Sequence, residues 1–79
     1  MTTEERVAKI FQQVLGIEPS VFSPRLSHDQ VLTWDSLGHI KIVEALEDEF
    51  RIEFDVDETM NMNSVGDIIQ MLSQKIGRV

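Results

Sequence analysis

Residues 34–50 read WDSLGHIKIVEALEDEF, and this stretch decides the fold. At about 100° per residue on a helical wheel, residues 36–50 separate into two faces. The face suited to a core, an arc of about 100°, holds Ile42, Leu46, Phe50, His39 and Val43. The opposite side holds Leu37, Ile40, Lys41, Glu44, Glu47 and Asp48. The pattern predicts an amphipathic helix whose apolar face must be covered by other helices.

Two further amphipathic helices flank this stretch. The first opens with the capping-box pattern Thr2-x-x-Glu5, and Gly16 is placed to end it. Its apolar residues follow the helical core spacing: Val7, Ile10, Phe11, Val14 and Leu15. The last helix opens at Ser64-Val65-Gly66-Asp67, with Gly77 near its end. Its expected inward residues are Val65, Ile68, Ile69, Leu72 and Ile76.

The segments between these helices are a long loop and a short helix. Residues 17–34 contain Pro19 and Pro24 and read as an ordered loop, which we expect five apolar residues to pin to the core: Val21, Phe22, Leu26, Val31 and Leu32. Loops beyond about 12–15 residues are uncommon in compact domains and are often functional. Residues 56–62 predict a short helix that needs packing to be stable. The fold class is therefore all-α, a small four-helix bundle with three main helices, one short helix and a long first loop, in one domain over residues 1–79.

Composition restricts the chemistry. The chain has 79 residues, is 42% hydrophobic and contains no cysteine, so it has no thiol nucleophile or thiolate metal ligand of its own. Any thioester chemistry would need a thiol from a prosthetic group. No apolar run approaches the roughly 20 residues that span a bilayer, and residues 1–5 lack a signal-peptide pattern, so we expect a cytoplasmic protein.

The net charge of −7 is concentrated in one part of the chain. Residues 35–67 hold ten acids against Lys41 and Arg51. This block disfavours nucleic-acid binding, which needs phosphate-neutralising cations, and favours docking to basic patches on other proteins. The alternative interpretation is an ordinary solvated helix face.

Ser36 is the residue best placed for covalent modification. Its hydroxyl lies where the loop meets the helix, and a phosphate attached to a first helical turn is stabilised by unpaired amides and the helix dipole. Taken alone, the serine could simply be an N-cap, since Ser and Asp both favour that position.

The run from Trp34 to Phe50, with its Asp-Ser-Leu motif followed by an acidic helix, closely resembles acyl carrier proteins of the discrete, stand-alone type. The resemblance implies that Ser36 bears 4′-phosphopantetheine, flanked by Asp35 and Leu37, whose thiol holds acyl groups for separate enzymes. It implies a phosphopantetheinyl transferase and acyl-loading and acyl-processing enzymes as partners. The implied docking residues are Leu37, Ile40, Glu44, Glu47 and Asp48.

The pathway and cargo stay open. Many fatty-acid carriers have an acid after Ser-Leu where this chain has Gly38-His39, which favours a specialised polyketide or related pathway. Gly38 could soften the site or permit close approach by a partner. A space for cargo could be lined by Phe54, Met60, Met62, Leu46 and Ile68, or these residues could simply form core. We expect a monomer.

Other functions are weaker alternatives. The first alternative is an aminoacyl or peptidyl carrier of a nonribosomal pathway, which the absence of a Leu-Gly-Gly-x-Ser pattern disfavours. The second, from a different class, is an unmodified acidic adaptor that binds another protein through Leu37 and Ile40. A Ser36–His39 hydrolase lacks an oxyanion-hole motif and a third triad member, so we expect no enzyme and a half-buried His39. Residues 55–59 match a phosphatase motif by chance. The same stretch does not fit a calcium-binding loop, because Met60 stands where glycine is required. No metal site is predicted.

Overall fold

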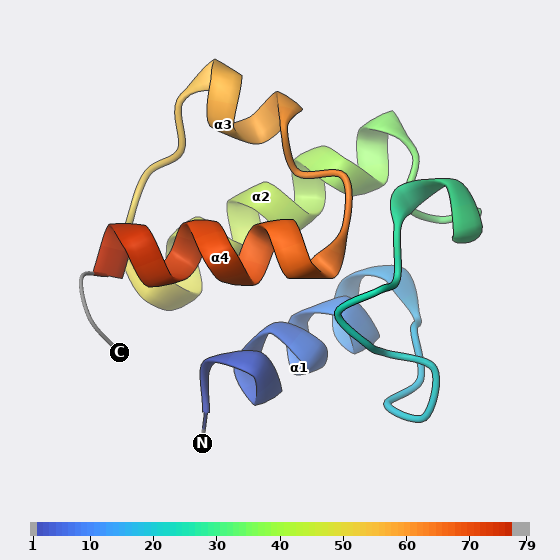
Figure 1. Ribbon diagram of the computed structural model, residues 1–79. Helices are drawn as coiled ribbons and strands as arrows, with labels where there is room; N and C mark the ends of the chain where they lie inside the picture. Colours follow the sequence, from blue (N-terminus) through green and yellow to red (C-terminus); the bar gives the residue numbers. More distant parts are fainter. Residues whose placement is uncertain (1, 77–79) are drawn as a thin grey trace.

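The computed structural model describes residues 2–76 and has the predicted all-α architecture (Figure 1). Its elements are α1 (Thr3–Leu15), the 3-10 helix η1 (His28–Gln30), α2 (Ser36–Phe50), α3 (Val56–Met60) and α4 (Val65–Ile76). Over the described residues, the only strand-like pairing is an isolated bridge between Ser27 and Ser64. The bundle of three main helices and one short helix is confirmed.

Helix α1 begins and ends where its capping residues predict. The Thr2 side chain accepts from the Glu5 amide, and the Glu5 side chain accepts from the Thr2 amide. Gly16 ends the helix with a φ of 74°, a left-handed conformation that glycine adopts without steric cost. These caps satisfy backbone groups that would otherwise lack partners.

Helix α2 is capped by Asp35, one residue before Ser36. The Asp35 carboxylate accepts from the Gly38 amide at 2.8 Å, so Ser36 is the first helical residue and another side chain serves as its cap. At the other end, Arg51 takes a left-handed φ of 57° and closes the helix.

The core lies where α1, α2 and α4 meet. Trp34, only 2% exposed, packs edge-on against Phe11 with ring centroids 5.0 Å apart. The other buried hydrophobic residues are Val7, Ile10, Leu15, Leu26, Ile42, Val43, Leu46, Met62, Val65, Ile68 and Leu72. The predicted inward faces of all three main helices are thus largely confirmed.

The long loop is held by backbone hydrogen bonds as well as by side chains. The first amides of α4 bond to it: Val65 donates to the Leu26 carbonyl and Gly66 to the Pro24 carbonyl, both at 2.9 Å. Leu26 is buried, and Phe22 and Val31 are half-buried, as expected. The prediction was wrong for Val21 and Leu32, which are 56% and 97% exposed. Because α4 anchors the loop through its backbone, not every apolar loop residue needs to reach the core.

Helix α4 leaves the core after Leu72. The Ser64 hydroxyl accepts from the Asp67 amide, which supports the predicted start, and Val65, Ile68 and Leu72 are buried. Ile76 was expected to point inward but is exposed, as is the whole last turn from Gln74. Gly77 lies outside the described residues.

Candidate functional site

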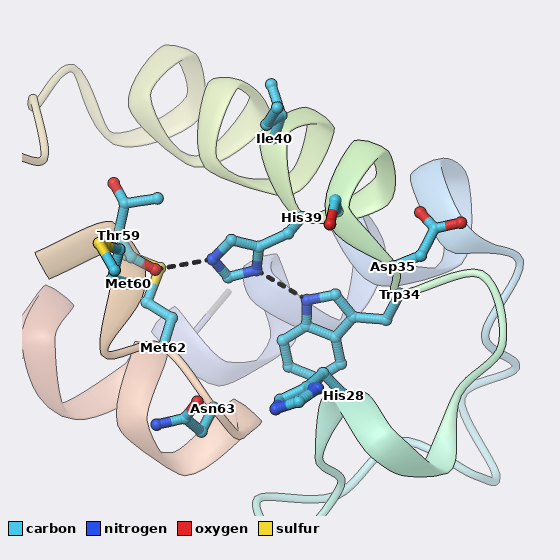
Figure 2. Close-up of a pocket in the computed structure, with 10 residues that line it drawn as sticks. His28, Trp34, Asp35, His39, Ile40, Thr59, Met60, Met62 and Asn63 are labelled. Atoms are coloured by element: carbon cyan, nitrogen blue, oxygen red, sulfur yellow. Dashed lines mark hydrogen bonds between the residues drawn. The ribbon is translucent and has the colours of Figure 1, made fainter. Parts of the chain in front are cut away.

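Ser36 is exposed and lines an open cavity of about 580 Å³, the Ser36 cavity. Three segments form it: η1, the start of α2, and the end of α3 with the residues that follow. Its lining residues are His28, Trp34, Asp35, Ser36, His39, Ile40, Thr59, Met60, Met62 and Asn63 (Figure 2). A cavity of this volume falls within the range of about 300–1,000 Å³ typical of ligand pockets.

One wall of the Ser36 cavity is a hydrogen-bonded chain through His39. Trp34 Nε1 donates to His39 Nδ1 at 2.9 Å, and His39 Nε2 lies 2.8 Å from the Thr59 carbonyl oxygen (Figure 2). An indole N–H can only donate, so Nδ1 is the acceptor and the ring proton lies on Nε2. His39 is therefore a neutral imidazole that donates to Thr59. The two rings lie nearly coplanar and edge to edge, with an interplanar angle of 19° and centroids 6.2 Å apart.

This arrangement gives His39 a structural role. Both ring nitrogens are engaged with Trp34 and Thr59, so neither is available to act as a base toward Ser36. His39 is half-buried, as expected. The Ser–His pairing considered from the sequence therefore has no geometric support.

Gly38 is required by packing inside the protein. A Cβ at this position would lie 2.1 Å from the Thr33 carbonyl oxygen and 3.0 Å from Leu15 Cδ2. The Thr33 hydroxyl in turn donates to the Leu15 carbonyl at 2.9 Å. The sequence suggested a softened site or close approach by a partner, but Gly38 is buried against the chain's own loop and the site is tightly packed.

The expected docking residues form an exposed surface, with one exception. Leu37 and Ile40 are 61% and 53% exposed, and Glu44 and Asp48 are exposed. Glu47 is half-buried because its Oε2 accepts from the Phe54 amide at 2.9 Å. Its carboxylate therefore holds the segment after α2 in place. Sequence periodicity alone put Glu47 on the solvent side and gave no sign of this bond.

The residues expected around a cargo space divide between two places. Met60 and Met62 line the Ser36 cavity, whereas Leu46 and Ile68 are buried in the core and, like Phe54, do not line it. Sequence reasoning missed His28, Trp34 and Asn63 as cavity residues. No local spacing joins these residues, because the cavity forms only when the long loop packs against the segment between α3 and α4, where the His28 amide donates to the Asn63 carbonyl.

The carboxyl groups whose pKa is shifted lie at helix caps and in turns, outside the Ser36 cavity. The Asp55 backbone amide, and then the Lys75 side chain, lower the pKa of Glu58. The Thr2 amide lowers the pKa of Glu5, and the Ser27 hydroxyl lowers that of Asp29. These shifts reflect local hydrogen bonds that stabilise the ionised form.

Residues 2–76 contain no group of three or more His, Cys, Asp or Glu side chains arranged to hold a metal ion. None of the helices in this range is long and apolar enough to cross a bilayer.

Known proteins resemble this chain over nearly its whole length. Residues 5–72 match the family model for the phosphopantetheine attachment site. An acyl carrier protein of Nitratidesulfovibrio vulgaris is 35% identical over 75 residues, covering 95% of this chain and 99% of that protein. One from Phenylobacterium zucineum is 33% identical over 73 residues, covering 92% of each.

The fold agrees with the sequence matches. The solution structure of holo acyl carrier protein from Geobacter metallireducens superposes with a TM-score of 0.84, at 29% identity, covering 96% of this chain and 87% of that one. Such proteins are carriers and not catalysts, and their prosthetic group is covalently attached 4′-phosphopantetheine. The chain belongs to the phosphopantetheine-attachment family and is an acyl carrier protein.

Proposed function

We propose that Ser36 is the attachment site for 4′-phosphopantetheine and that the chain carries acyl groups for separate biosynthetic enzymes. The observation that carries this proposal is the position of Ser36 as the exposed first residue of α2, beside the Ser36 cavity. Because Asp35 caps the helix, the Ser36 hydroxyl is not needed as a cap. A phosphodiester here would lie at the positive end of the α2 dipole.

The attachment chemistry requires an exposed hydroxyl and a partner enzyme. Ser36 Oγ attacks the phosphorus of coenzyme A that bears pantetheine, and a new P–O bond forms. The pyrophosphate bond breaks, adenosine 3′,5′-bisphosphate leaves, and the serine proton passes to a base of the transferase. Once attached, the arm supplies the thiol for thioester linkage, which this cysteine-free chain cannot supply itself.

The surface beside Ser36 suits brief contacts with enzymes that have basic patches. Leu37 and Ile40 offer exposed apolar area, and Glu44 and Asp48 offer charge on the same helix. Charge-steered association is fast and salt-sensitive, which fits a carrier that must visit several enzymes. Asp35 and Glu47 contribute by holding the helix start and the segment after α2. We propose polyketide or fatty-acid-like intermediates as the cargo.

Charge reversal at Glu44 tests the docking surface. Glu44→Lys should slow modification by a transferase with a basic docking patch, since attraction becomes repulsion, while the unfolding midpoint stays within a few degrees. Glu18→Lys, an exposed change in the long loop, is the matched control. Equal modification rates for all three proteins at low salt would remove Glu44 from the docking surface.

Intact-mass spectrometry tests the attachment. The chain is incubated with coenzyme A, Mg²⁺ and a promiscuous phosphopantetheinyl transferase, and we expect a gain of one phosphopantetheinyl group. Ser36→Ala should gain nothing, and Ser20→Ala, in an exposed loop position, should gain one group like the wild type. No gain on the folded wild-type chain, while a reference carrier is modified, would contradict the proposal and favour an unmodified adaptor.

A further inference from the structure

The Ser36 cavity differs in character from the core beneath it. Its lining combines apolar and polar side chains: Ile40 and Met60 are apolar, whereas His28 and Asn63 are polar (Figure 2). Ile40 and Met60 are 53% and 71% exposed, so the cavity is open to solvent. Leu46 and Ile68, by contrast, are fully buried and lie outside it. A chain attached beside Ser36 therefore has an open site available without entering the core.

His39 spans the distance between α2 and α3 at the inner side of this cavity. Its ring reaches from α2 to the Thr59 carbonyl oxygen, as the dashed line in Figure 2 shows. Helix α3 has only five residues, too few to be stable without outside contacts. The Thr59 carbonyl also accepts from the Met62 amide at 3.5 Å, so the bond to His39, at 2.8 Å, is the shorter of the two. His39 therefore fixes where α3 lies relative to α2.

Trp34 determines which ring nitrogen of His39 carries the proton. Its indole N–H donates to Nδ1, which places the ring proton on Nε2, the atom that faces Thr59. The indole is 2% exposed and packed against Phe11, so it is a rigid support. The chain Trp34–His39–Thr59 thus links the core, α2 and α3 through one neutral imidazole.

We propose that His39 is a positioning residue that keeps α3 closed against α2, so that an acyl group on the Ser36 arm occupies the open Ser36 cavity rather than the core. This inference rests on the proposed attachment at Ser36. It predicts that the acyl group contacts Trp34, Met60 and Asn63, and that Leu46 and Ile68 are not disturbed.

The two ring nitrogens can be tested separately. Glutamine can place an amide N–H near the position of Nε2, so His39→Gln should keep the bond to Thr59 and lose the acceptor for Trp34. Asparagine can place an oxygen near Nδ1, so His39→Asn should keep the bond from Trp34 and fail to reach Thr59. His39→Ala loses both bonds. These variants separate closure of α3 from general support of the fold.

The test is NMR of the octanoyl-loaded protein against the holo form. In the wild type we expect octanoyl-dependent shifts at the Trp34 indole, Met60 and Asn63, with none at Leu46 or Ile68. His39→Gln should behave like the wild type, whereas His39→Asn and His39→Ala should show new shifts at Leu46 and Ile68. Wild-type shifts at Leu46 and Ile68 as large as in His39→Ala, or no shifts at the cavity residues, would overturn the proposal.

The unmodified chain supplies an independent measurement. Long-range proton–nitrogen NMR should show His39 in the neutral form with its proton on Nε2, and the Trp34 indole signal should move in His39→Gln and stay near its wild-type position in His39→Asn. Protonation on Nδ1 would overturn the closure mechanism even if Ser36 is modified. Failure of loading, with this NMR result intact, would instead contradict the attachment at Ser36.

Discussion

The two halves of α2 are held in different ways. From Ile42 onward, the helix is fixed by burial against neighbouring helices, and Ile42 and Leu46 are completely buried. From Ser36 to Ile40, the helix is fixed by specific hydrogen bonds and one close backbone contact, through Gly38, His39 and the capping residue Asp35. The first half presents the chemistry and the second supplies stability. The difference indicates that the position of the region around Ser36, the proximal half, depends on individual hydrogen bonds and contacts. The position of the helix from Ile42 onward, the distal half, depends mainly on the volume of its buried apolar side chains.

The distal half should give the largest stability effect. Leu46→Ala removes a fully buried side chain and should lower the free energy of unfolding by about 2–5 kcal/mol, because a cavity forms among α1, α2 and α4. Urea denaturation measures this loss. Leu37→Ala, on the exposed face of the same helix, should change stability by less than about 0.5 kcal/mol. Equal losses would mean that α2 is oriented differently from the structure described here.

Gly38→Ala should destabilise the packing of the proximal half of α2 through a steric clash. Alanine normally stabilises a helix relative to glycine by about 1 kcal/mol, but here its Cβ would lie 2.1 Å from the Thr33 carbonyl oxygen. Since that atom belongs to the backbone, we expect a net loss of about 1–3 kcal/mol. Thermal unfolding measures the sign directly. A higher unfolding temperature in the variant would show that the loop is not packed against Gly38.

His39→Ala should produce a similar or smaller loss by a different cause. The change leaves the buried Trp34 indole N–H without its acceptor, which costs about 1–3 kcal/mol unless water replaces it. The exposed His28→Ala is the matched control and should have little effect. Chemical denaturation followed by Trp34 fluorescence gives both values, because Trp34 is the single tryptophan of the chain. Indistinguishable stabilities for the two variants would contradict the structural role of His39.

Much of this comparison could be predicted from the sequence, and the missing part has a physical reason. Burial follows helical periodicity, so residues such as Phe11, Leu46 and Leu72 could be placed on inward faces. The bond between His39 and Thr59 joins residues twenty positions apart, and the clash at Gly38 involves a loop without periodicity. Such contacts depend on how the chain returns on itself. The exposure of Leu32 was missed for the same reason.

The smallest effect concerns α3 and depends on pH. The Asp55 amide and Lys75 lower the pKa of Glu58 from its usual value of about 4.3. An acid with a lowered pKa in the folded state stabilises the fold above its unfolded pKa, and the contribution is lost as pH falls through the folded value. Wild type should therefore exceed Glu58→Gln in stability above about pH 5, and the difference should shrink below about pH 4.

Unfolding midpoints across pH 3–7 check this prediction. Glu53→Gln, at an exposed position just before α3, is the control for the loss of one negative charge. A difference between wild type and Glu58→Gln that grows toward low pH would contradict the assigned sign.

Peptide-level mass spectrometry of the modified chain tests the central claim most directly. Cleavage after Arg25 and Lys41 releases residues 26–41, which contain three hydroxyl side chains, Ser27, Thr33 and Ser36. We predict one phosphopantetheinyl group on this peptide, with fragment ions that place it on Ser36. A group on Ser27, on Thr33 or on another peptide would contradict the account, because the start of α2 would then not be the point of attachment.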